Sequence, residues 1–595
     1  MMIRAGHAVG RLVGVASWWA ALALVAGCGE PEAVGTATAS FGSGTGSVDD
    51  GFETMVGWSG SSGWVTTGPD DPVGPCGDDP TCLPPSEMVP TAKPDGLPSP
   101  LPGVYDDQGP APPDAGFRAL LGFPTRQREL LESRVALMYA PGSPLFRSYM
   151  TVEQWMAEHA PDPTEVALIE NWLRSRGFTI DFEAKNRLLV QFSGTVADFN
   201  ATFQTELHIC MRKNPLWDDP PFPVYCTLDR FTLPKFVAER TNGLATADLP
   251  AEKGELTPEV GKVVPDPPGP EAYGPRAFYG AYNMHPLFDA GFTGRGSSVG
   301  VVAAGTYHAI DLQIFWKSFG VERALPKRVP VMEPVFERVT ETALDVQWAT
   351  ALAPGAEAVV YEGPDARNTS LLFTWNHAIA ADEVDVLTFS FAHREDSEPK
   401  PLRHQYDESA LMGAAIGMTL VSASGDSGKP DTPCSSPYVT CVGGTQLIAS
   451  QEGVIEKEWA WQMSGSGLAK TFARPYWQDA DVTADRRAMA DLALSSSTEY
   501  PMWMRRWAKW EFFGGTSFAA PAFAGMIAVV NGYRRSLGLP RVGFLNPILY
   551  GHQPTRSTFR DILYGFTEHY QAGPGWDYPT GLGAPDVAML ALALP

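Results

Sequence analysis

The chain has 595 residues and a formal net charge of −24 at pH 7, from 44 lysine and arginine against 68 aspartate and glutamate residues. This acidity argues against binding nucleic acid or anionic lipid by long-range attraction. The length leaves room for more than one folded unit, and the apolar run of residues 12–25 is too short for a stable membrane span.

The first residues are typical of an export signal. Arg4 and Arg11 are basic, residues 12–25 are apolar, and the run ends in Leu-Val-Ala-Gly-Cys28, which resembles a bacterial lipobox. Residues 1–28 are therefore expected to be a lipoprotein signal peptide, with Cys28 lipidated after cleavage; a plain secretory signal is the alternative. We expect a cell-envelope lipoprotein, attached to the membrane only through Cys28, or an extracellular protein after processing.

Residues 29–112 are expected to be a disordered tether. They are mostly Gly, Ser, Thr, Pro and Asp, with few apolar side chains. Such a segment cannot bury enough surface to fold alone.

Residues 113–248 are expected to form a small α+β sandwich. Strand-like and helix-like patterns alternate, with helices predicted over 125–138, 163–176 and 196–203. Residues 249–272 are rich in Pro, Glu and Gly, and exposed linkers of this kind are where proteolysis concentrates.

Residues 273–595 are long enough for one large core. Continuous apolar runs at 298–304, 358–362, 384–391 and 418–424 are separated by helical segments. This pattern predicts a parallel sheet covered on both faces.

Glu341 and Asp345 lie in a predicted amphipathic helix that ends at Pro354. Leu344 and Trp348 recur at helical spacing, and the two acidic residues, four apart, share a face that overlaps this apolar stripe. Two like charges there raise the pKa of one of them, which suits proton exchange in acid. A partly solvated acidic edge is the commoner alternative for such a pair.

Asp426 follows a predicted buried strand directly, within Ser-Gly-Asp-Ser-Gly. It therefore lies beyond the carboxyl end of a parallel strand, where open α/β sheets bind their ligands. An Asx-type turn is the alternative for an aspartate between glycines.

Ser517 lies on a glycine turn, Gly-Gly-Thr-Ser, that leads directly into a helix. Pro521 suits a first helical turn, so the serine is expected near the positive helix end. A Gly-rich turn before a buried helix is the alternative. A serine nucleophile needs a base, yet His308 and His377 are isolated and outside any His-Gly-Thr-His stretch.

These motifs, in this order, resemble the three signatures of the sedolisins, the serine-carboxyl peptidases. Further similar segments are Ser-Ser-Pro-Tyr-Val with Val-Gly-Gly-Thr445, and Ala-Gly-Pro-Gly-Trp-Asp577. The resemblance covers roughly residues 113–595. It implies a subtilisin-like doubly wound α/β catalytic domain at 273–595, and a sedolisin-type propeptide at 113–248 that inhibits the enzyme until the linker is cut.

The resemblance also implies a role for each catalytic residue. Ser517 would be the nucleophile, Glu341 its general base and acid, and Asp345 the partner that orients Glu341. Asp426 would be the oxyanion-hole donor, which requires its protonated form. The expected function is a monomeric endopeptidase that hydrolyses proteins at acidic pH through an acyl-enzyme and matures by self-cleavage. A neutral subtilisin-like enzyme and an inactive envelope protein are the alternatives.

One structural calcium ion is implied near the C-terminus. Its ligands would be two carboxylates and three backbone carbonyls, the hard oxygens that calcium takes. They are Asp561, Ile562, Gly573, Gly575 and Asp577. If the family resemblance is set aside, the alternative is a Gly-Pro turn with ordinary surface aspartates.

Six cysteines remain once Cys28 is set aside, and they fall into sequence-close pairs. Local disulfides in an oxidising compartment are the simplest inference; other pairings are formally open, and metal binding is the weaker interpretation. The expected pairs are Cys76–Cys82, Cys210–Cys226 and Cys434–Cys441.

Overall fold

The structure is a computed structural model that describes residues 3–4, 88–90, 105–212, 222–227, 231–246, 269–332, 339–391, 393–396 and 398–595. The expected signal peptide apart from β1 (Ile3–Arg4), Cys28, the expected Cys76–Cys82 pair, most of the expected tether and nearly all of the expected linker lie outside the described residues. No helix in the described part of the chain has both the length and the apolar character needed to cross a membrane.

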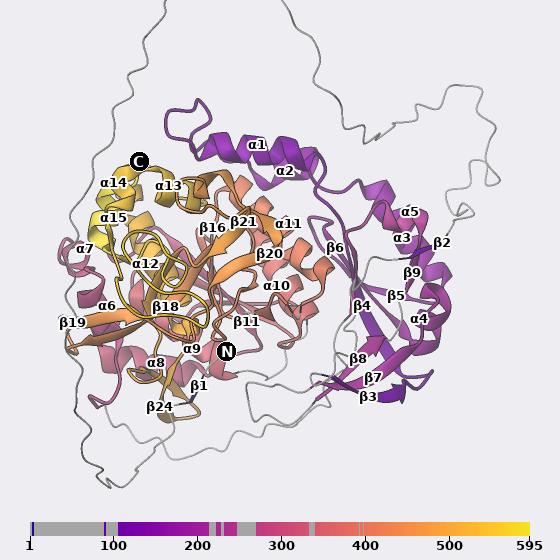
Figure 1. Ribbon diagram of the computed structural model, residues 1–595, viewed down its shortest axis with the longest axis horizontal. Coiled ribbons are helices and arrows are strands. Elements are labelled where there is room, and N and C mark those ends of the chain that lie inside the picture. Colours follow the sequence, from indigo (N-terminus) through magenta and orange to yellow (C-terminus); the bar gives the residue numbers. More distant parts are fainter. Residues whose placement is uncertain are drawn as a thin grey trace, which may run out of the picture. The chain divides into compact units, whose positions relative to one another are not determined.

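The described residues between Met88 and Thr246 form an α+β unit, as the alternating patterns predict (Figure 1). Its strands are β2 (Met88–Pro90), β3 (Tyr105–Pro110), β4 (Gly116–Gly122), β5 (Thr179–Glu183), β6 (Leu189–Thr195), β7 (Leu207–Arg212), β8 (Phe222–Thr227), β9 (Thr232–Pro234) and β10 (Gly243–Thr246). Its helices are α1 (Arg128–Met138), α2 (Val152–Glu158), α3 (Pro163–Ser175), α4 (Val196–Phe203) and α5 (Lys235–Ala238).

Two antiparallel sheets organise this unit, in the orders β10-β4-β6-β5 and β3-β7-β8. Local sequence starts the helices: Asp162 caps α3 ahead of Pro163, and Thr195 forms a capping box with Asp198 at α4. β3 lies within the segment expected to be a tether. It pairs with β7, so backbone hydrogen bonding orders these residues despite their polar composition.

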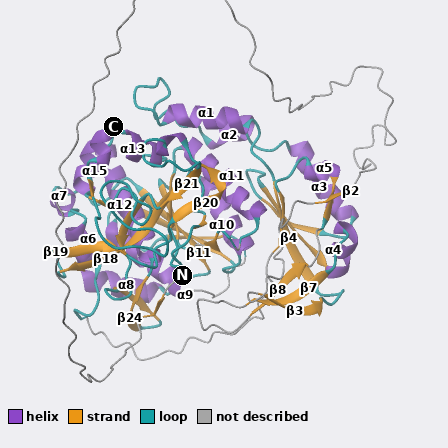
Figure 2. Ribbon diagram, viewed as in Figure 1, coloured by secondary structure: helices purple, strands orange, loops and turns teal. Residues whose placement is uncertain are grey.

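The region from residue 269 onward contains an eight-stranded sheet in the order β12-β13-β11-β14-β16-β18-β19, with β22 paired beside β18 (Figure 2). These strands are β11 (Ser298–Ala304), β12 (Lys327–Pro330), β13 (Glu357–Gly363), β14 (Val386–Phe389), β16 (Thr419–Ala423), β18 (Thr440–Ala449), β19 (Ile455–Ala460) and β22 (Leu492–Ser495). All pairings are parallel except β18–β19. The predicted parallel, doubly covered sheet is confirmed.

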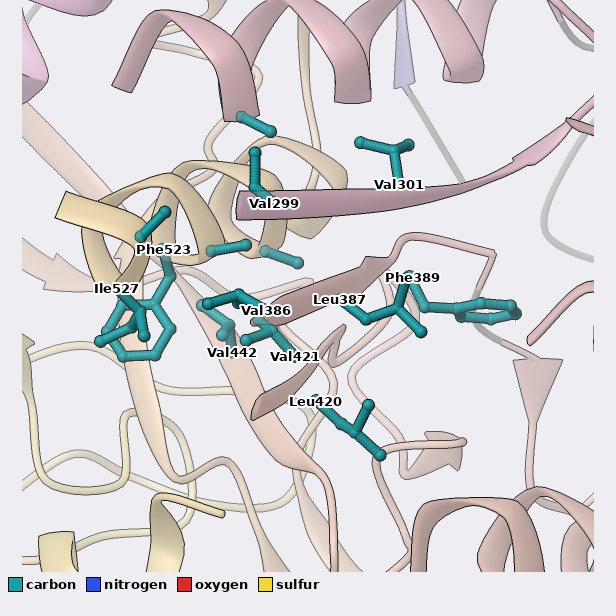
Figure 3. Close-up of a cluster of buried hydrophobic side chains, with 14 of the residues drawn as sticks. Val299, Val301, Val386, Leu387, Phe389, Leu420, Val421, Val442, Phe523 and Ile527 are labelled. Carbon is teal, nitrogen blue, oxygen red and sulfur yellow. The ribbon is translucent and has the colours of Figure 1, made fainter. Parts of the chain in front are cut away.

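Four long helices cover this sheet: α9 (Val339–Leu352), α10 (Asn368–Ala381), α11 (Lys400–Ile416) and α12 (Thr516–Ser536). Side chains of α12 and of the central strands form one apolar core (Figure 3). The labelled members of this core are Val299, Val301, Val386, Leu387, Phe389, Leu420, Val421, Val442, Phe523 and Ile527.

The remaining elements are short or lie around the sheet. They are α6 (Pro275–Ala281), α7 (His285–Asp289), α8 (Ala309–Phe319), β15 (His393–Arg394), β17 (Asp431–Thr432), β20 (Gly467–Ala473), η1 (Tyr476–Gln478), β21 (Arg486–Met489), β23 (Met502–Arg506), β24 (Lys509–Gly514), α13 (Asn546–Gly551), α14 (Gln553–Arg556), β25 (Phe559–Arg560), β26 (Ala584–Pro585) and α15 (Val587–Ala593). β1 pairs with β24.

Helices α9 and α12 pack closely because a glycine lies between them. A methyl group built on Gly525 of α12 would lie 2.6 Å from the carbonyl oxygen of Ala349 in α9. Trp348 and Phe518 meet edge to face nearby, with ring centroids 5.4 Å apart. Glycine at this position therefore lets the two helix backbones approach each other.

Contacts also join α1 and α2 to the catalytic region through α11. Arg128 of α1 forms ion pairs with Asp407 at 2.5 Å and with Glu408 at 2.9 Å. The hydroxyl of Tyr139 donates to the carbonyl of Ala414 at 2.7 Å. Apolar side chains of α1 and α2 belong to the same buried core as those of α11.

Candidate active site

Ser517 lies in the first turn of α12, directly after β24. Gly514 has no room for a side chain, because a methyl group there would lie 2.5 Å from the backbone nitrogen of Thr498. Gly515 follows with φ +150°, and the helix begins at Thr516. Ser517 is fully buried in this structure and lies at the positive end of the helix.

Pro521 lies one turn deeper than the sequence suggests. The helix already begins at Thr516, so this proline is inside it rather than in its first turn. An ordinary residue at 521 would donate its N–H to the carbonyl of Ser517, and proline cannot. The sequence alone misplaced it because the preceding glycines mask where helical geometry starts.

Glu341 and Asp345 both lie on α9 and are both buried, with exposed fractions of 7% and 0%. The helix is buried around its whole circumference over residues 341–353, so it is not amphipathic as predicted. Its acidic pair nevertheless faces the protein interior. Helix α9 is enclosed because α12 packs directly against it.

The two acidic side chains of α9 interact strongly. Burial, and then the neighbouring Glu341 carboxylate, raise the pKa of Asp345 well above its usual range, while the Ser390 hydroxyl opposes the shift. Glu341 Oε1 is buried without a hydrogen-bond partner among the described residues. The pair can therefore hold a proton under conditions where an exposed aspartate has lost it.

Asp426 links this acidic pair to α12, the helix that carries Ser517. Its Oδ1 accepts hydrogen bonds from the backbone N–H and the hydroxyl of Thr516, both at 2.8 Å. Burial raises the pKa of Asp426, hydrogen bonds from Thr516 oppose this, and the Glu341 carboxylate adds to it. Asp426 is thus bound to the residue that precedes Ser517 and lies within electrostatic reach of Glu341.

The structure therefore brings together all four predicted catalytic residues. Glu341 and Asp345 share a helix, Asp426 lies beyond β16 as predicted, and Ser517 starts the helix that packs on α9. The two histidines weighed as bases lie in other elements: His308 precedes α8, and His377 of α10 meets Tyr361 edge to face.

Sequence reasoning did not single out Asp431, a further buried carboxyl beside the site. Burial, and then Asp426, raise its pKa well above the usual range. Its position in a Gly-Lys-Pro-Asp loop looks exposed in the sequence, yet only 3% of it is accessible. The apolar strands and cysteine that flank this loop were the available signal.

The five predicted calcium ligands lie in one loop region. Asp577 Oδ2 accepts from the Gly573 N–H at 2.9 Å, and Asp561 Oδ2 accepts from the Gly575 N–H at 2.7 Å. Burial raises the pKa of Asp577 to about 6, and the nearby Asp561 carboxylate contributes to this shift. Ile562, which follows Asp561, is buried. Two close carboxylates on one loop fit the oxygen donors of a calcium site.

Two of the expected disulfides lie within the described residues, and both are formed. Cys210 bonds to Cys226 between β7 and β8, and Cys434 bonds to Cys441 beside β16.

Comparison with known proteins identifies both regions. Residues 105–215 match the pro-kumamolisin activation domain, and residues 339–539 match the subtilase family. Kumamolisin from Bacillus sp. (strain MN-32) is 29% identical over 540 residues, which covers 82% of this chain and 94% of kumamolisin. Tripeptidyl-peptidase 1 from Homo sapiens is 25% identical over 554 residues, which covers 83% of this chain and 94% of that protein.

A solved Pseudomonas sedolisin, described as a serine-carboxyl proteinase in complex with pseudo-iodotyrostatin, has a TM-score of 0.48 and 24% identity; the alignment covers 55% of this chain and 98% of that one. The activation-domain match, the subtilase match and the full-length relatives define the class: a serine-type peptidase made with a propeptide. The chain combines a pro-kumamolisin activation domain with a subtilase-family domain, an organisation consistent with the sedolisin family of serine-carboxyl peptidases. The resemblance seen in its motifs is confirmed.

Proposed function

We propose that this peptidase is an endopeptidase that acts at acidic pH through an acyl-enzyme on Ser517. The observation that carries the proposal is the position of Asp426, which is bound to Thr516 beside the nucleophile and is electrostatically linked to Glu341. This arrangement supplies an alcohol, a carboxylate base and an acid donor without an imidazole.

In the proposed first step, Ser517 Oγ attacks the carbonyl carbon of the scissile peptide bond, and Glu341 takes the hydroxyl proton. Asp345, whose pKa is raised by burial and by the Glu341 carboxylate, would hold the proton of the pair and leave Glu341 as the acceptor. The carbonyl oxygen becomes negative and receives a hydrogen bond from protonated Asp426.

The tetrahedral intermediate then collapses. The C–N bond breaks, and the proton held by Glu341 passes to the leaving amine, so the acyl group remains on Ser517 as an ester. Water hydrolyses this ester with Glu341 again acting as base, which restores the serine hydroxyl and releases the acid product. Asp426 Oδ1 is occupied by Thr516, so Oδ2 is the oxygen placed to carry the donating proton.

Endopeptidase action is tested by digesting an acid-denatured protein and sequencing the products by mass spectrometry. Internal fragments of varied length support the proposal. Tripeptides alone, released in order from the N-terminus, would instead favour the tripeptidyl-peptidase activity named for several relatives. Ser517→Ala is the control, and its preparation should give neither product.

We infer that one calcium ion binds Asp561 and Asp577 together with carbonyl oxygens of Ile562, Gly573 and Gly575. The ion would neutralise two carboxylates that otherwise repel each other at the end of the chain. Its role would be structural, because the proposed proton transfers use other residues. Calcium titration of the purified protein, followed by calorimetry, tests binding, and Asp577→Asn should abolish the signal.

We also propose self-processing between residues 249 and 272, and lipid attachment at Cys28. Cleavage in the linker would separate the catalytic region from both the anchor and the propeptide. In acid, wild-type precursor should shorten whereas Ser517→Ala precursor stays full length; cutting of the pure Ser517→Ala protein would contradict self-processing. Radiolabelled palmitate should enter the wild-type chain but not Cys28→Ala.

A further inference from the structure

The loop between β16 and β18, residues 424–439, carries Asp426 and then folds back toward the strand it left. Its first residues are bound to the nucleophile helix: the Gly425 N–H donates to the Thr516 hydroxyl at 3.1 Å, and that hydroxyl donates to Asp426. The later residues of the loop, which fold back toward β16, therefore determine what covers the Gly425–Asp426 turn on the side that does not contact α12.

Asp431, in the returning part, lies directly against the turn. A methyl group built on Gly425 would lie 1.7 Å from Asp431 Oδ2, so the carboxyl group occupies the space that a side chain at 425 would need. Gly425 also has φ +94°, which favours glycine. Asp431 is held there by the pairing of β17 with β15, in which Arg394 lies opposite it.

The Cys434–Cys441 disulfide fastens this returning segment to the sheet. Cys434 Sγ lies 3.4 Å from the carbonyl oxygen of Ser422 and 3.3 Å from that of Ala423, at the end of β16. Cys441 belongs to β18 and is the register partner of Ser422. The bridge thus joins the loop to two neighbouring strands, close in sequence to both Asp426 and Asp431.

We propose that the Cys434–Cys441 disulfide is a positioning element of the catalytic site, which holds Asp431 against the Gly425–Asp426 turn and keeps the Asp426 carboxyl buried beside Thr516. This inference rests on the proposed function, because it assigns the bridge a role through the oxyanion donor. Neither cysteine contacts the reacting atoms. Both are fully buried and act through the loop.

Loss of the bridge should reveal itself in the pH dependence of catalysis. Within the described part of the chain, the charged groups that influence Asp426 and Asp431 are Glu341, Arg394 and Asp396, besides the two aspartates themselves. Burial is the first cause that raises the pKa of Asp426. A loosened loop admits water, so Asp426 loses its proton at lower pH and the hydrogen-bond donor disappears earlier as pH rises.

The test compares two double variants of the full-length chain after maturation in acid. Cys434→Ala/Cys441→Ala removes the bridge beside the site, and Cys210→Ala/Cys226→Ala removes the bridge in the propeptide. Wild-type activity in acid is measured first, so that absence of any activity counts against the proposed function and not against this inference. Near-ultraviolet circular dichroism confirms that each mature protein is folded.

For the bridge beside the site we expect kcat to fall about tenfold and the basic limb of the kcat/KM profile to move down by about one pH unit. The propeptide variant should retain the wild-type profile once mature. An unchanged kcat and basic limb in folded enzyme would overturn the proposal. So would a change confined to KM for one class of substrate side chain, which would assign the loop to substrate selection.

A variant that does not fold is replaced by Cys434→Ala/Cys441→Val, which restores part of the lost volume at the buried site. The same shift of the basic limb in this protein supports the proposal. If neither variant folds while the propeptide variant does, the bridge serves folding and the proposal is wrong.

Discussion

Arg128 of α1 offers a direct way to measure how firmly the propeptide is held. It pairs with Asp407 and Glu408 of α11, whose side chains are only 1% and 5% exposed, and with Glu132 of its own helix. Glu408 also accepts the Thr125 N–H at 3.2 Å and the Asn242 amide at 3.3 Å. These three donors to Glu408, Arg128, Thr125 and Asn242, all belong to the propeptide region.

Arg128→Ala leaves two buried carboxylates without their cation. Breaking a buried ion pair by removing one partner costs about 3–5 kcal/mol, and the 29% exposure of Arg128 reduces this to about 2–3 kcal/mol. The open state of the contact should then become roughly 30–150-fold more populated near neutral pH. The effect should shrink in acid, because protonation of the stranded carboxyl groups removes their unpaired charge.

The assay is hydrogen exchange of α11 amides in the full-length Ser517→Ala precursor, a variant that should not undergo the proposed self-processing. Arg134→Ala is the matched control, because Arg134 lies on the same helix and pairs with Glu158 where both side chains are more exposed, 32% and 48%. That substitution should change exchange by a factor of no more than about five. Equal exchange in the Arg128 and Arg134 variants at neutral pH would refute the reasoning.

Three further predictions concern the site and the calcium loop. Glu341→Gln should lower kcat about 10²–10⁴-fold with intact folding, measured on an acid-cleaved peptide; near-normal kcat would exclude it as the base. Asp426→Asn keeps an acceptor for Thr516 and places an amide donor that does not titrate, so the basic limb of kcat should move to higher pH, and an unmoved limb would count against Asp426 as the donor. In calcium-free protein the pKa of Asp577 is raised to about 6, so the folded state favours the protonated carboxyl group. This preference contributes about 3 kcal/mol to the free energy of unfolding below pH 4, and the contribution is lost as pH rises through 6. Calcium should therefore raise the melting temperature more at pH 7 than at pH 4, whereas Asp577→Asn, which should not bind calcium, should show no rise at either pH.

The motifs were informative because they combine local chemistry with strand order. Asp426 was placed correctly because a buried strand followed by Gly-Asp must end at the carboxyl edge of a parallel sheet. Ser517 followed from the glycine turn, although the first residue of its helix did not, since the turn residues tolerate several conformations. The four predicted strands near the site all match strands of the sheet.

Other features depend on contacts that sequence periodicity does not encode. Helix α9 looks amphipathic in isolation, but it is buried all round because α12 and neighbouring elements enclose it. β3 has a polar sequence and is ordered by pairing with β7. Asp431 is buried because its loop folds back onto Gly425, a long-range contact with no local signature.

The close approach at Gly525 means that the proposed proton acceptor and nucleophile are carried by two helices whose backbones come into direct contact at this point. Glu341 and Ser517 should consequently move together during thermal motion of the rest of the domain. A larger residue at position 525 would push α12 away from α9 and lengthen the distance over which the proton passes from Ser517 to Glu341, although no reacting group would be changed.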